Sequence, residues 1–351
     1  MKLLLVKLGH LGDVLLMTPT LRLLRTQFPS ARIDVMVRRG THAALEDNPD
    51  LSNLYLETPP KQERTAGMAS GFFRNVRGLF AQRYDYGFDL SNSDRARLWL
   101  LLSATRTRCA NNPYGELGKK RYLYNQLANF QWARDHQVLR DFRTVTESLH
   151  LQAEPGPLYI CTGNLDTTAL AQRLPFIPGL ERYAVIHPTS RWAFKQWLPE
   201  RWARVADWLT ATQGLKVVFT SGPDPREQSY VDGILSHCQN KHAATRGATS
   251  LRELAWLISK ATLFCGVDTV AMHLAAAVQT PTVCLFGPSS EWSWHPWQNR
   301  HELVLGACQC KQTRVFVCDK SRPYPCMEGI TETEVHDKIL KLMANSKSLS
   351  R

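Results

Sequence analysis

Blocks of apolar residues along the first half of the chain predict strands and helices in alternation. The run KLLLVKL at 2–8 predicts a buried strand, and 14–27 carries apolar residues at helical spacing, with Pro19 as an irregularity. Further apolar runs predict strands at 32–37, 54–56 and 86–90. Because strands that alternate with helices are typical of βαβ units, we predict a parallel sheet.

The pattern weakens at 151–180, where prolines and glycines cluster, and a second α/β series then begins. Because 351 residues exceed one ordinary core, we expect two domains. The predicted fold is α/β, with two Rossmann-like domains whose parallel sheets face a central cleft. In the second half we predict strands at 183–187, 216–220, 261–265 and 282–286, and helices at 199–210, at 251–259 and from Val270. The expected boundaries are an N-terminal domain at 1–165, a linker at 166–180, a C-terminal domain at 181–330, and a helix with a tail at 331–351.

The basic charge of the chain favours an anionic partner. Net charge is +12, and residues 60–125 hold twelve Lys or Arg against five Asp or Glu. A phosphorylated substrate, a membrane surface or nucleic acid would each fit. Nucleic acid is the remote alternative, because no helix-turn-helix, zinc-finger or RNP-type signature is evident. Without an export signal or a membrane-spanning run, we expect a cytoplasmic protein whose nine cysteines stay reduced.

The segment FCGVDTVAMHLAAA is the most specific one in the chain. It predicts a buried strand that ends at Gly266 and a helix that begins near Thr269. The free amides and the dipole at the start of that helix would bind a pyrophosphate. Asp268 could accept hydrogen bonds from sugar hydroxyls, and His273 would share a helix face with Thr269. A plain helix cap and a core histidine would give the same pattern.

Two more segments follow predicted strands of the second half. In HPTSRWAFKQW, the hydroxyls of Thr189 and Ser190 and the ammonium of Lys195 suit a diphosphate leaving group without a metal. A turn with a solvated lysine is the alternative. In TSGPDPRE, Glu227 opens a predicted helix and could accept hydrogen bonds from ribose hydroxyls. An ordinary first-turn glutamate is favoured there from spacing alone.

In the N-terminal half, Gly12 and Asp13 follow the first predicted strand. The G-x-G-x-x-G spacing of a dinucleotide fingerprint is missing. A carboxylate at this position could act as the general base for an acceptor hydroxyl. A cap for the following helix is an equally good interpretation of Asp13.

Four cysteines near the C-terminus raise the question of a zinc site. They are Cys308, Cys310, Cys318 and Cys326. Their spacings differ from the paired C-x₂₋₄-C ligands of most structural zinc sites. A structural metal at these cysteines is therefore the less favoured alternative and stays open. In the functional site itself we expect no metal and no cofactor.

Taken together, these segments resemble the lipopolysaccharide heptosyltransferases, glycosyltransferase family 9, whose fold is called GT-B. The resemblance covers almost the whole chain, and the TSGPD and WxPW elements are most similar to the heptosyltransferase III branch. It implies an inverting transferase that moves L-glycero-D-manno-heptose from ADP-heptose to a heptose of the lipopolysaccharide inner core. A heptosyltransferase I or II type acceptor, or another nucleotide sugar, stays open. The matching segments are KLGHLGDVLLMTP, HPTSRWAFKQW, TSGPDPRE, GVDTVAMHLAAAVQTPTVCLFGP and WHPW.

The resemblance also implies residue roles. Asp13 would be the catalytic base, Lys195 would bind the donor phosphates, and Asp268 would hold the heptose hydroxyls. Many relatives have glycine where Val270 stands, so this chain departs from the family there. The rest of the donor site would comprise Thr189, Ser190, Glu227, Thr269, Val270, Ala271 and His273.

On the acceptor side we expect cationic residues to meet the phosphates and carboxylates of the inner core on lipid A. These residues are Lys7, Arg64, Arg74 and Arg77. The mixed aromatics and arginines of 72–80 would suit a helix that lies at the cytoplasmic face of the inner membrane. An amphipathic helix packed on the sheet would show the same pattern.

Overall fold

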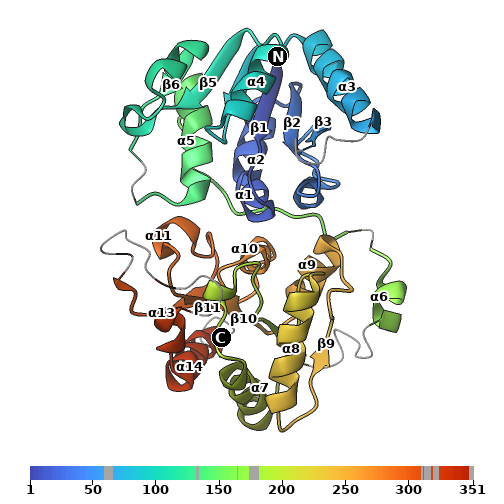
Figure 1. The fold of residues 1–351 in the computed structure, drawn as a ribbon, viewed down its shortest axis with the longest axis vertical. Coiled ribbons are helices and arrows are strands. Elements are labelled where there is room, and N and C mark those ends of the chain that lie inside the picture. The colour runs from blue at the N-terminus through green and yellow to red at the C-terminus, as the bar shows by residue number, and fades with distance from the viewer. Residues whose placement is uncertain are drawn as a thin grey trace. The chain divides into compact units, whose positions relative to one another are not determined.

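The structure is a computed structural model that describes residues 1–58, 66–131, 134–163, 165–173, 182–309, 311, 318 and 324–347. The chain divides into two compact units, Met1–Cys161 and Thr162–Arg351. Each unit has its own six-stranded sheet, and every strand pairing is parallel (Figure 1). The prediction of two parallel α/β sheets is therefore confirmed.

The sheet of the first unit has the strand order β3-β2-β1-β4-β5-β6. Helices α3 and α4 pack on one face of it, and α5 packs with α2 on the other. The strands are β1 Lys2–Lys7, β2 Arg32–Arg38, β3 Asn53–Glu57, β4 Tyr86–Asp89, β5 Thr107–Asn111 and β6 Gln126–Ala128. The helices are α1 Leu11–Leu16, α2 Thr18–Gln27, α3 Ala66–Gln82, α4 Asp94–Leu102 and α5 Gln137–Leu149, with 3₁₀ turns at His42–Leu45, Pro113–Gly115 and Gly118–Leu123.

The sheet of the second unit has the strand order β12-β11-β10-β7-β8-β9. Helices α7, α8 and α14 cover one face, and α9 and α10 lie on the other. The strands are β7 Tyr183–His187, β8 Lys216–Phe219, β9 Ala243–Ala244, β10 Leu263–Val267, β11 Thr282–Phe286 and β12 His301–Leu305. The helices are α6 Thr167–Arg173, α7 Pro199–Gln213, α8 Pro225–His237, α9 Leu251–Ser259, α10 Val270–Ala277, α11 Glu291–Trp294, α13 Pro325–Glu328 and α14 Glu332–Lys347, with a 3₁₀ turn at Ala193–Lys195.

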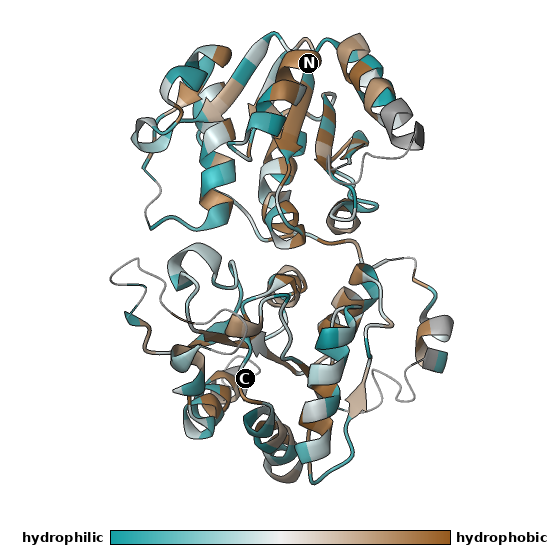
Figure 2. Cartoon of the chain, viewed as in Figure 1, coloured by the Kyte–Doolittle hydropathy of each residue, from teal (hydrophilic) through white to brown (hydrophobic). Residues whose placement is uncertain are grey.

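The central strands are buried on both faces, which explains why they appear in the sequence as continuous apolar runs. Every residue of β7, β10 and β11 is buried, as are Leu3–Lys7 of β1. Figure 2 shows the same hydrophobic character along the central strands of both sheets. Helices on both faces of a parallel sheet leave its carboxyl edge as the place where polar side chains can gather.

Several boundaries differ from the predicted ones. Helix α1 begins at Leu11, so Asp13 lies inside its first turn, and the break at Met17 before α2 matches the irregularity expected at Pro19. The strand predicted at 261–265 is shifted to Leu263–Val267. It includes Gly266, where a side chain would come within 2.8 Å of the His187 carbonyl oxygen. Helix α6 occupies part of the segment expected to be a linker.

Strand order reverses once in each sheet. In the first unit the chain starts at β1, adds β2 and β3 on one side, and then crosses to β4 on the other. In the second unit the same reversal separates β7 from β10. Ligands of open α/β sheets bind outside the strand carboxyl ends at such a reversal. The residues after β1, β4, β7 and β10 therefore lie where a ligand of such a sheet would bind.

Candidate active site

In the second unit, the residues that follow β7 and β10 form an ion pair. Lys195 lies in the 3₁₀ turn after β7, and Asp268 directly follows β10. The Lys195 Nζ donates to Asp268 Oδ2 at 2.6 Å, and the two side chains are only 23% and 9% exposed. From the sequence we expected Lys195 to bind the donor phosphates and Asp268 to bind the donor sugar. The structure brings them together at the point of strand reversal.

Among the described residues, the side chain of the N-cap residue makes no capping bond to the first turn of α10. Thr269 is the N-cap residue with extended backbone, but its Oγ1 donates to the Val267 carbonyl at 3.4 Å instead of accepting from the helix. Asp268 is occupied by Lys195. The amides that follow, at Val270 and Ala271, therefore lie at a helix start whose dipole attracts anions. His273, one turn further, is buried beside Trp294.

A buried hydroxyl and imidazole network lies at the end of β7. The His187 Nδ1 is 2.8 Å from Thr220 Oγ1, and its Nε2 is 3.3 Å from Thr189 Oγ1. Burial lowers the pKa of His187 to about 4, so the ring is neutral at pH 7. Thr189 and Ser190 are both buried at this strand end. These contacts join the end of β7 to Thr189, in the connection that leads to Lys195.

Glu227 makes a specific contact within its own strand–helix connection. Its Oε2 accepts from the Gly222 amide at 3.0 Å, while Asp224 is the N-cap of α8 and accepts from Arg226. A side chain at position 222 would come within 3.0 Å of the Glu227 carboxylate, so glycine is needed for this approach. The carboxylate is thus held at the carboxyl end of β8, beside the end of β7.

In the first unit, Asp13 lies on a pocket of about 330 Å³ at the ends of β1, β4 and β5. Its Oδ2 accepts from the His10 amide at 2.7 Å, which is half of a capping box. Gly9 gives the chain room here, since a side chain would come within 2.7 Å of the Asp13 carboxylate. The pocket is lined by Lys7, Leu8, Gly9, Asp13, Arg38, Asp89, Leu90, Ser91, Asn92, Ser93, Asn111, Gln137, Arg140, Asp141 and Thr144.

Lys7 shares this pocket but is already paired. Its ammonium donates to Asp141 Oδ1 and Oδ2 at 2.8 and 2.7 Å and to the Leu90 carbonyl at 3.0 Å. Both side chains are almost fully buried. Burial raises the pKa of Asp141 to about 6, although Lys7 opposes the rise. The three N–H groups of Lys7 therefore donate to oxygens of the protein. The Lys7 ammonium has no further donor for a phosphate of the acceptor saccharide.

The other expected acceptor residues lie apart from this pocket. Arg74 and Arg77 are exposed on α3, and Arg74 lines a different hollow of about 340 Å³ with Tyr55, Phe72 and Trp99. Arg64 lies outside the described residues. Asn111, Arg140 and Asp141 were not predicted as site residues, because they come from segments that only the fold brings to β1.

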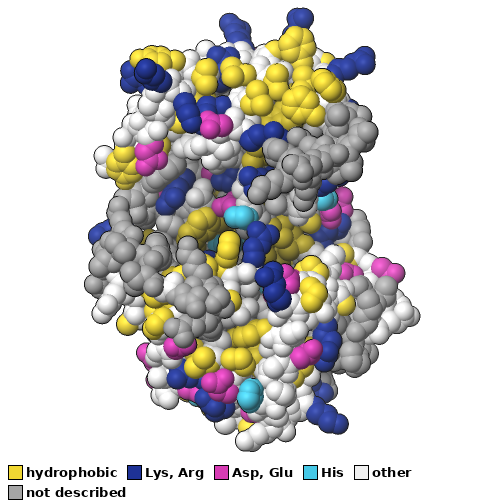
Figure 3. Space-filling model, in the orientation of Figure 1, with side chains coloured by type: hydrophobic (Ala, Val, Ile, Leu, Met, Phe, Trp, Pro, Cys, Tyr) yellow, Lys and Arg dark blue, Asp and Glu magenta, His cyan; other side chains and the backbone are white. Residues whose placement is uncertain are grey.

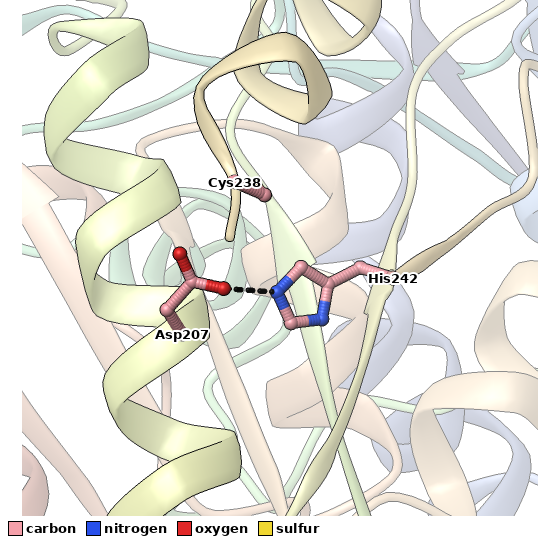
Figure 4. Close-up of side chains that lie close together, drawn as sticks. All are labelled: Asp207, Cys238 and His242. Atoms are coloured by element: carbon pink, nitrogen blue, oxygen red, sulfur yellow. Dashed lines mark hydrogen bonds and ion pairs between the residues drawn. The ribbon is translucent and has the colours of Figure 1, made fainter. Parts of the chain in front are cut away.

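A group of potential metal ligands lies elsewhere in the second unit. Ligand atoms of Asp207, Cys238 and His242 lie within 4.8 Å of one another (Figure 4). The Asp207 carboxylate also accepts from the amides of Gln239 and Asn240 at 2.8 and 3.0 Å, and from the ring of His242 at 3.0 Å. These bonds explain the group as an anchor between α7 and the loop before β9.

The cysteine group near the C-terminus is described in part. Cys310 lies outside the described residues. Burial, with a further contribution from Cys308 and then Cys318, raises the pKa of the Cys326 thiol to about 12. A thiol held protonated in this way is a poor nucleophile at neutral pH. We therefore assign the Cys326 thiol no role in catalysis.

Comparison with known proteins identifies the family. A model of glycosyltransferase family 9, the heptosyltransferases, matches residues 72–322. The chain belongs to this family. It is 31% identical over 299 residues to "Lipopolysaccharide heptosyltransferase 3" of Escherichia coli, an alignment that covers 82% of this chain and 84% of that protein.

Solved structures of the family share the fold. The E. coli ADP-heptose lps heptosyltransferase II has a TM-score of 0.77 at 18% identity, with 99% of this chain and 100% of that chain covered. The E. coli heptosyltransferase WaaC with ADP has a TM-score of 0.72 at 18% identity, with 97% and 100% covered. The expected GT-B fold of a family 9 glycosyltransferase is therefore confirmed. Among the described residues, no helix combines the length and the apolar character needed to cross a membrane.

Proposed function

We propose that this family 9 glycosyltransferase moves heptose from ADP-heptose to a heptose of the lipopolysaccharide inner core, with inversion at the anomeric carbon. Its 31% identity to a lipopolysaccharide heptosyltransferase 3 supports the donor and the acceptor class. The observation that carries the proposal is the Lys195–Asp268 pair beside the uncapped start of α10. Cation, helix dipole and carboxylate at one strand reversal are the groups that a sugar diphosphate needs.

On the donor side, each group has one task. The first-turn amides of α10 and the Lys195 ammonium bind the diphosphate and stabilise the charge that grows on it as ADP leaves. Asp268 accepts from Lys195 through Oδ2, so its other oxygen accepts from a heptose hydroxyl. Glu227 binds the ribose, and Thr189, Ser190 and His273 complete the site around the nucleotide.

Asp13 is the catalytic base. Its Oδ2 is occupied by the His10 amide, and Oδ1 takes the proton of the acceptor hydroxyl. As that proton leaves, the hydroxyl oxygen attacks the anomeric carbon, and the bond from that carbon to the phosphate oxygen breaks with its electron pair going to ADP. One bond forms as one breaks, so the configuration inverts.

A surface on the first unit supports docking at the membrane where a lipid A acceptor resides. Phe73 and Phe80, seven residues apart on one face of α3, are 68% and 56% exposed, and Arg74 and Arg77 are exposed beside them. Hydrophobic and basic side chains gather over this part of the unit in Figure 3. Aromatic side chains flanked by arginine suit an anionic lipid surface.

Mass analysis of products tests the function directly. The full chain is incubated with ADP-heptose and defined truncated core acceptors, with millimolar EDTA in one arm. We expect one added heptose, release of ADP, and no loss of turnover in EDTA, because protein cations hold the diphosphate. Transfer from a different nucleotide sugar with ADP-heptose inert would refute the donor assignment.

A further inference from the structure

A buried side-chain amide lies at the wall of the Asp13 pocket with both of its polar atoms unpartnered. Asn111 is the last residue of β5 and is 2% exposed. Within the described part of the chain, neither its Nδ2 nor its Oδ1 has a hydrogen-bond partner. A buried amide in this state costs the fold free energy, since its bonds to water are lost and not replaced.

The position of Asn111 on its strand places it beside the polar groups of the pocket. Side chains alternate across a strand, and Ala110 belongs to the core that packs under α3 and α4. Asn111 therefore faces the opposite side of the sheet, where α5 packs on β5. From α5, Arg140 and Asp141 line the same pocket.

Other polar groups of the pocket are engaged within the protein. The Lys7 ammonium is held by Asp141 and the Leu90 carbonyl. Asp89 accepts from the Tyr124 hydroxyl at 2.6 Å and from the amides of Ser91 and Asn92. The Asn92 Oδ1 is a further buried atom with no partner among the described residues. Asn111 and Asn92 thus bring buried amide atoms to this pocket that have no partner among the described residues.

We propose that the Asn111 amide binds two neighbouring hydroxyls of the acceptor sugar, in the pocket that also holds Asp13. An amide has two donor hydrogens and a carbonyl acceptor, so Oδ1 accepts from one hydroxyl while Nδ2 donates to the next. A pocket of about 330 Å³ falls at the lower end of small-molecule sites, as a single sugar ring requires. The inference rests on the proposed function, because it assigns the first unit to the acceptor.

The matched pair of variants is Asn111→Leu and Asn112→Leu. Leucine is close to asparagine in size and has no polar atom, so Asn111→Leu removes an unpartnered amide and should keep or raise the melting temperature. The Asn112 Oδ1, in contrast, accepts from the Leu117 amide at 3.1 Å, so Asn112→Leu should lower it. Opposite stability effects at adjacent positions separate a binding residue from a structural one.

Steady-state kinetics with ADP-heptose and a core acceptor give the functional readout. We expect Asn111→Leu to raise the acceptor KM about tenfold or more, as two lost hydrogen bonds would, and to leave the donor KM within about twofold. Asn112→Leu should leave both KM values unchanged where it is folded. An unchanged acceptor KM in Asn111→Leu, or a lowered melting temperature with it, would overturn the proposal.

Binding of a simple sugar keeps this inference separate from the proposed function. Methyl L-glycero-α-D-manno-heptoside is added to the full chain, and saturation-transfer NMR compares wild type with Asn111→Leu. Loss of the signal in Asn111→Leu supports the pocket even if wild type transfers no heptose, a result that would refute only the proposed function. An equal signal in both proteins refutes the pocket assignment whatever the wild-type activity is.

Discussion

Asp13 combines a structural contact with the position of a base, and the two roles predict different consequences of one substitution. Asp13→Asn keeps an oxygen that can accept from the His10 amide, so the variant should fold and bind ADP nearly normally. It cannot take a proton at neutral pH. Loss of a general base typically costs about 10²–10⁴ in rate, so we expect turnover at least about a hundredfold slower, measured by ADP release.

The control for Asp13 is Glu253, which occupies the same capping-box position in α9. Glu253→Gln should lower stability by at most about 1 kcal/mol and leave turnover unchanged. If Asp13→Asn behaves like Glu253→Gln, with near-normal turnover and a lower melting temperature, Asp13 is only a cap. The base would then be another group in the pocket.

Because Lys195 pairs with Asp268, replacing the lysine changes two interactions at once. Lys195→Ala removes a cation and also exposes the nucleotide to an unpaired Asp268, so two effects would weaken ADP binding. The cleaner comparison is Lys195→Ala/Asp268→Asn against Asp268→Asn alone. We expect the double variant to bind ADP more weakly by roughly 1.5–3 kcal/mol, the scale of a charged hydrogen bond, by calorimetry. Equal affinity in the two variants would make Lys195 only a partner of Asp268.

The sequence predicts a site residue when the strand or helix that positions it lies in the same short segment. Asp268 and Thr269 directly follow β10, and Lys195 lies in the 3₁₀ turn of the connection after β7, so a short motif contains both the element and the side chain. The Lys195–Asp268 contact itself joins residues 73 apart and was not predicted. Asn111 and Asp141 sit in ordinary segments, and only the parallel pairing of β5 and the packing of α5 bring them to Asp13.

The buried Lys7–Asp141 ion pair links strand β1 to helix α5. Asp141→Asn would leave a buried ammonium without its counter-charge, and we expect a loss of about 3–5 kcal/mol in the free energy of unfolding, measured with urea. Arg143 lies on the same helix and makes partly exposed pairs with Asp135, which precedes α5, and with Glu147. Arg143→Gln should cost at most about 1 kcal/mol.

The double variant Lys7→Met/Asp141→Leu tests whether the pair itself stabilises the fold. The pKa of Asp141 is about 6, above its ordinary value, so ionising it in the native state costs stability as pH rises through about 4 to 6. We therefore expect the double variant to recover most of the loss or to exceed wild type at neutral pH. Stability as low as that of Asp141→Asn would show that the pair is a net stabiliser.

Element types were easier to predict than element boundaries. The apolar runs of β1, β7 and β11 are continuous because both faces of those strands are buried, and the predicted positions hold. Strands β5, β6, β9 and β12 were not predicted. Their sequences TRCAN, QLA, AA and HELVL lack a long apolar run, since they lie toward the sheet edges and are partly exposed.

The two units repeat one topology, but different polar groups lie at the carboxyl edges of their sheets. The strand reversal of the first unit carries carboxylates and amides, and that of the second carries a lysine and a helix start. Alternating strands and helices predict this repeat, because a parallel sheet requires crossovers. The charge surplus at 60–125 predicts an anionic partner but no particular contact, since Lys and Arg side chains reach solvent from many backbone positions.

That surplus gives a test that involves the whole chain. Exposed Arg74 and Arg77 on α3 would attract an anionic acceptor through solvent, where about 0.15 M salt screens charges beyond roughly 8 Å. The donor diphosphate is held by the partly buried Lys195 and the α10 amides, which salt screens less. We therefore expect the acceptor KM to rise with salt more steeply than the donor KM. Arg74→Gln/Arg77→Gln should flatten the acceptor slope alone, while Arg204→Gln, an exposed arginine of α7 paired with Glu332, should change neither. Equal slopes for both substrates in wild type would mean that α3 packs on the sheet without recognising the acceptor.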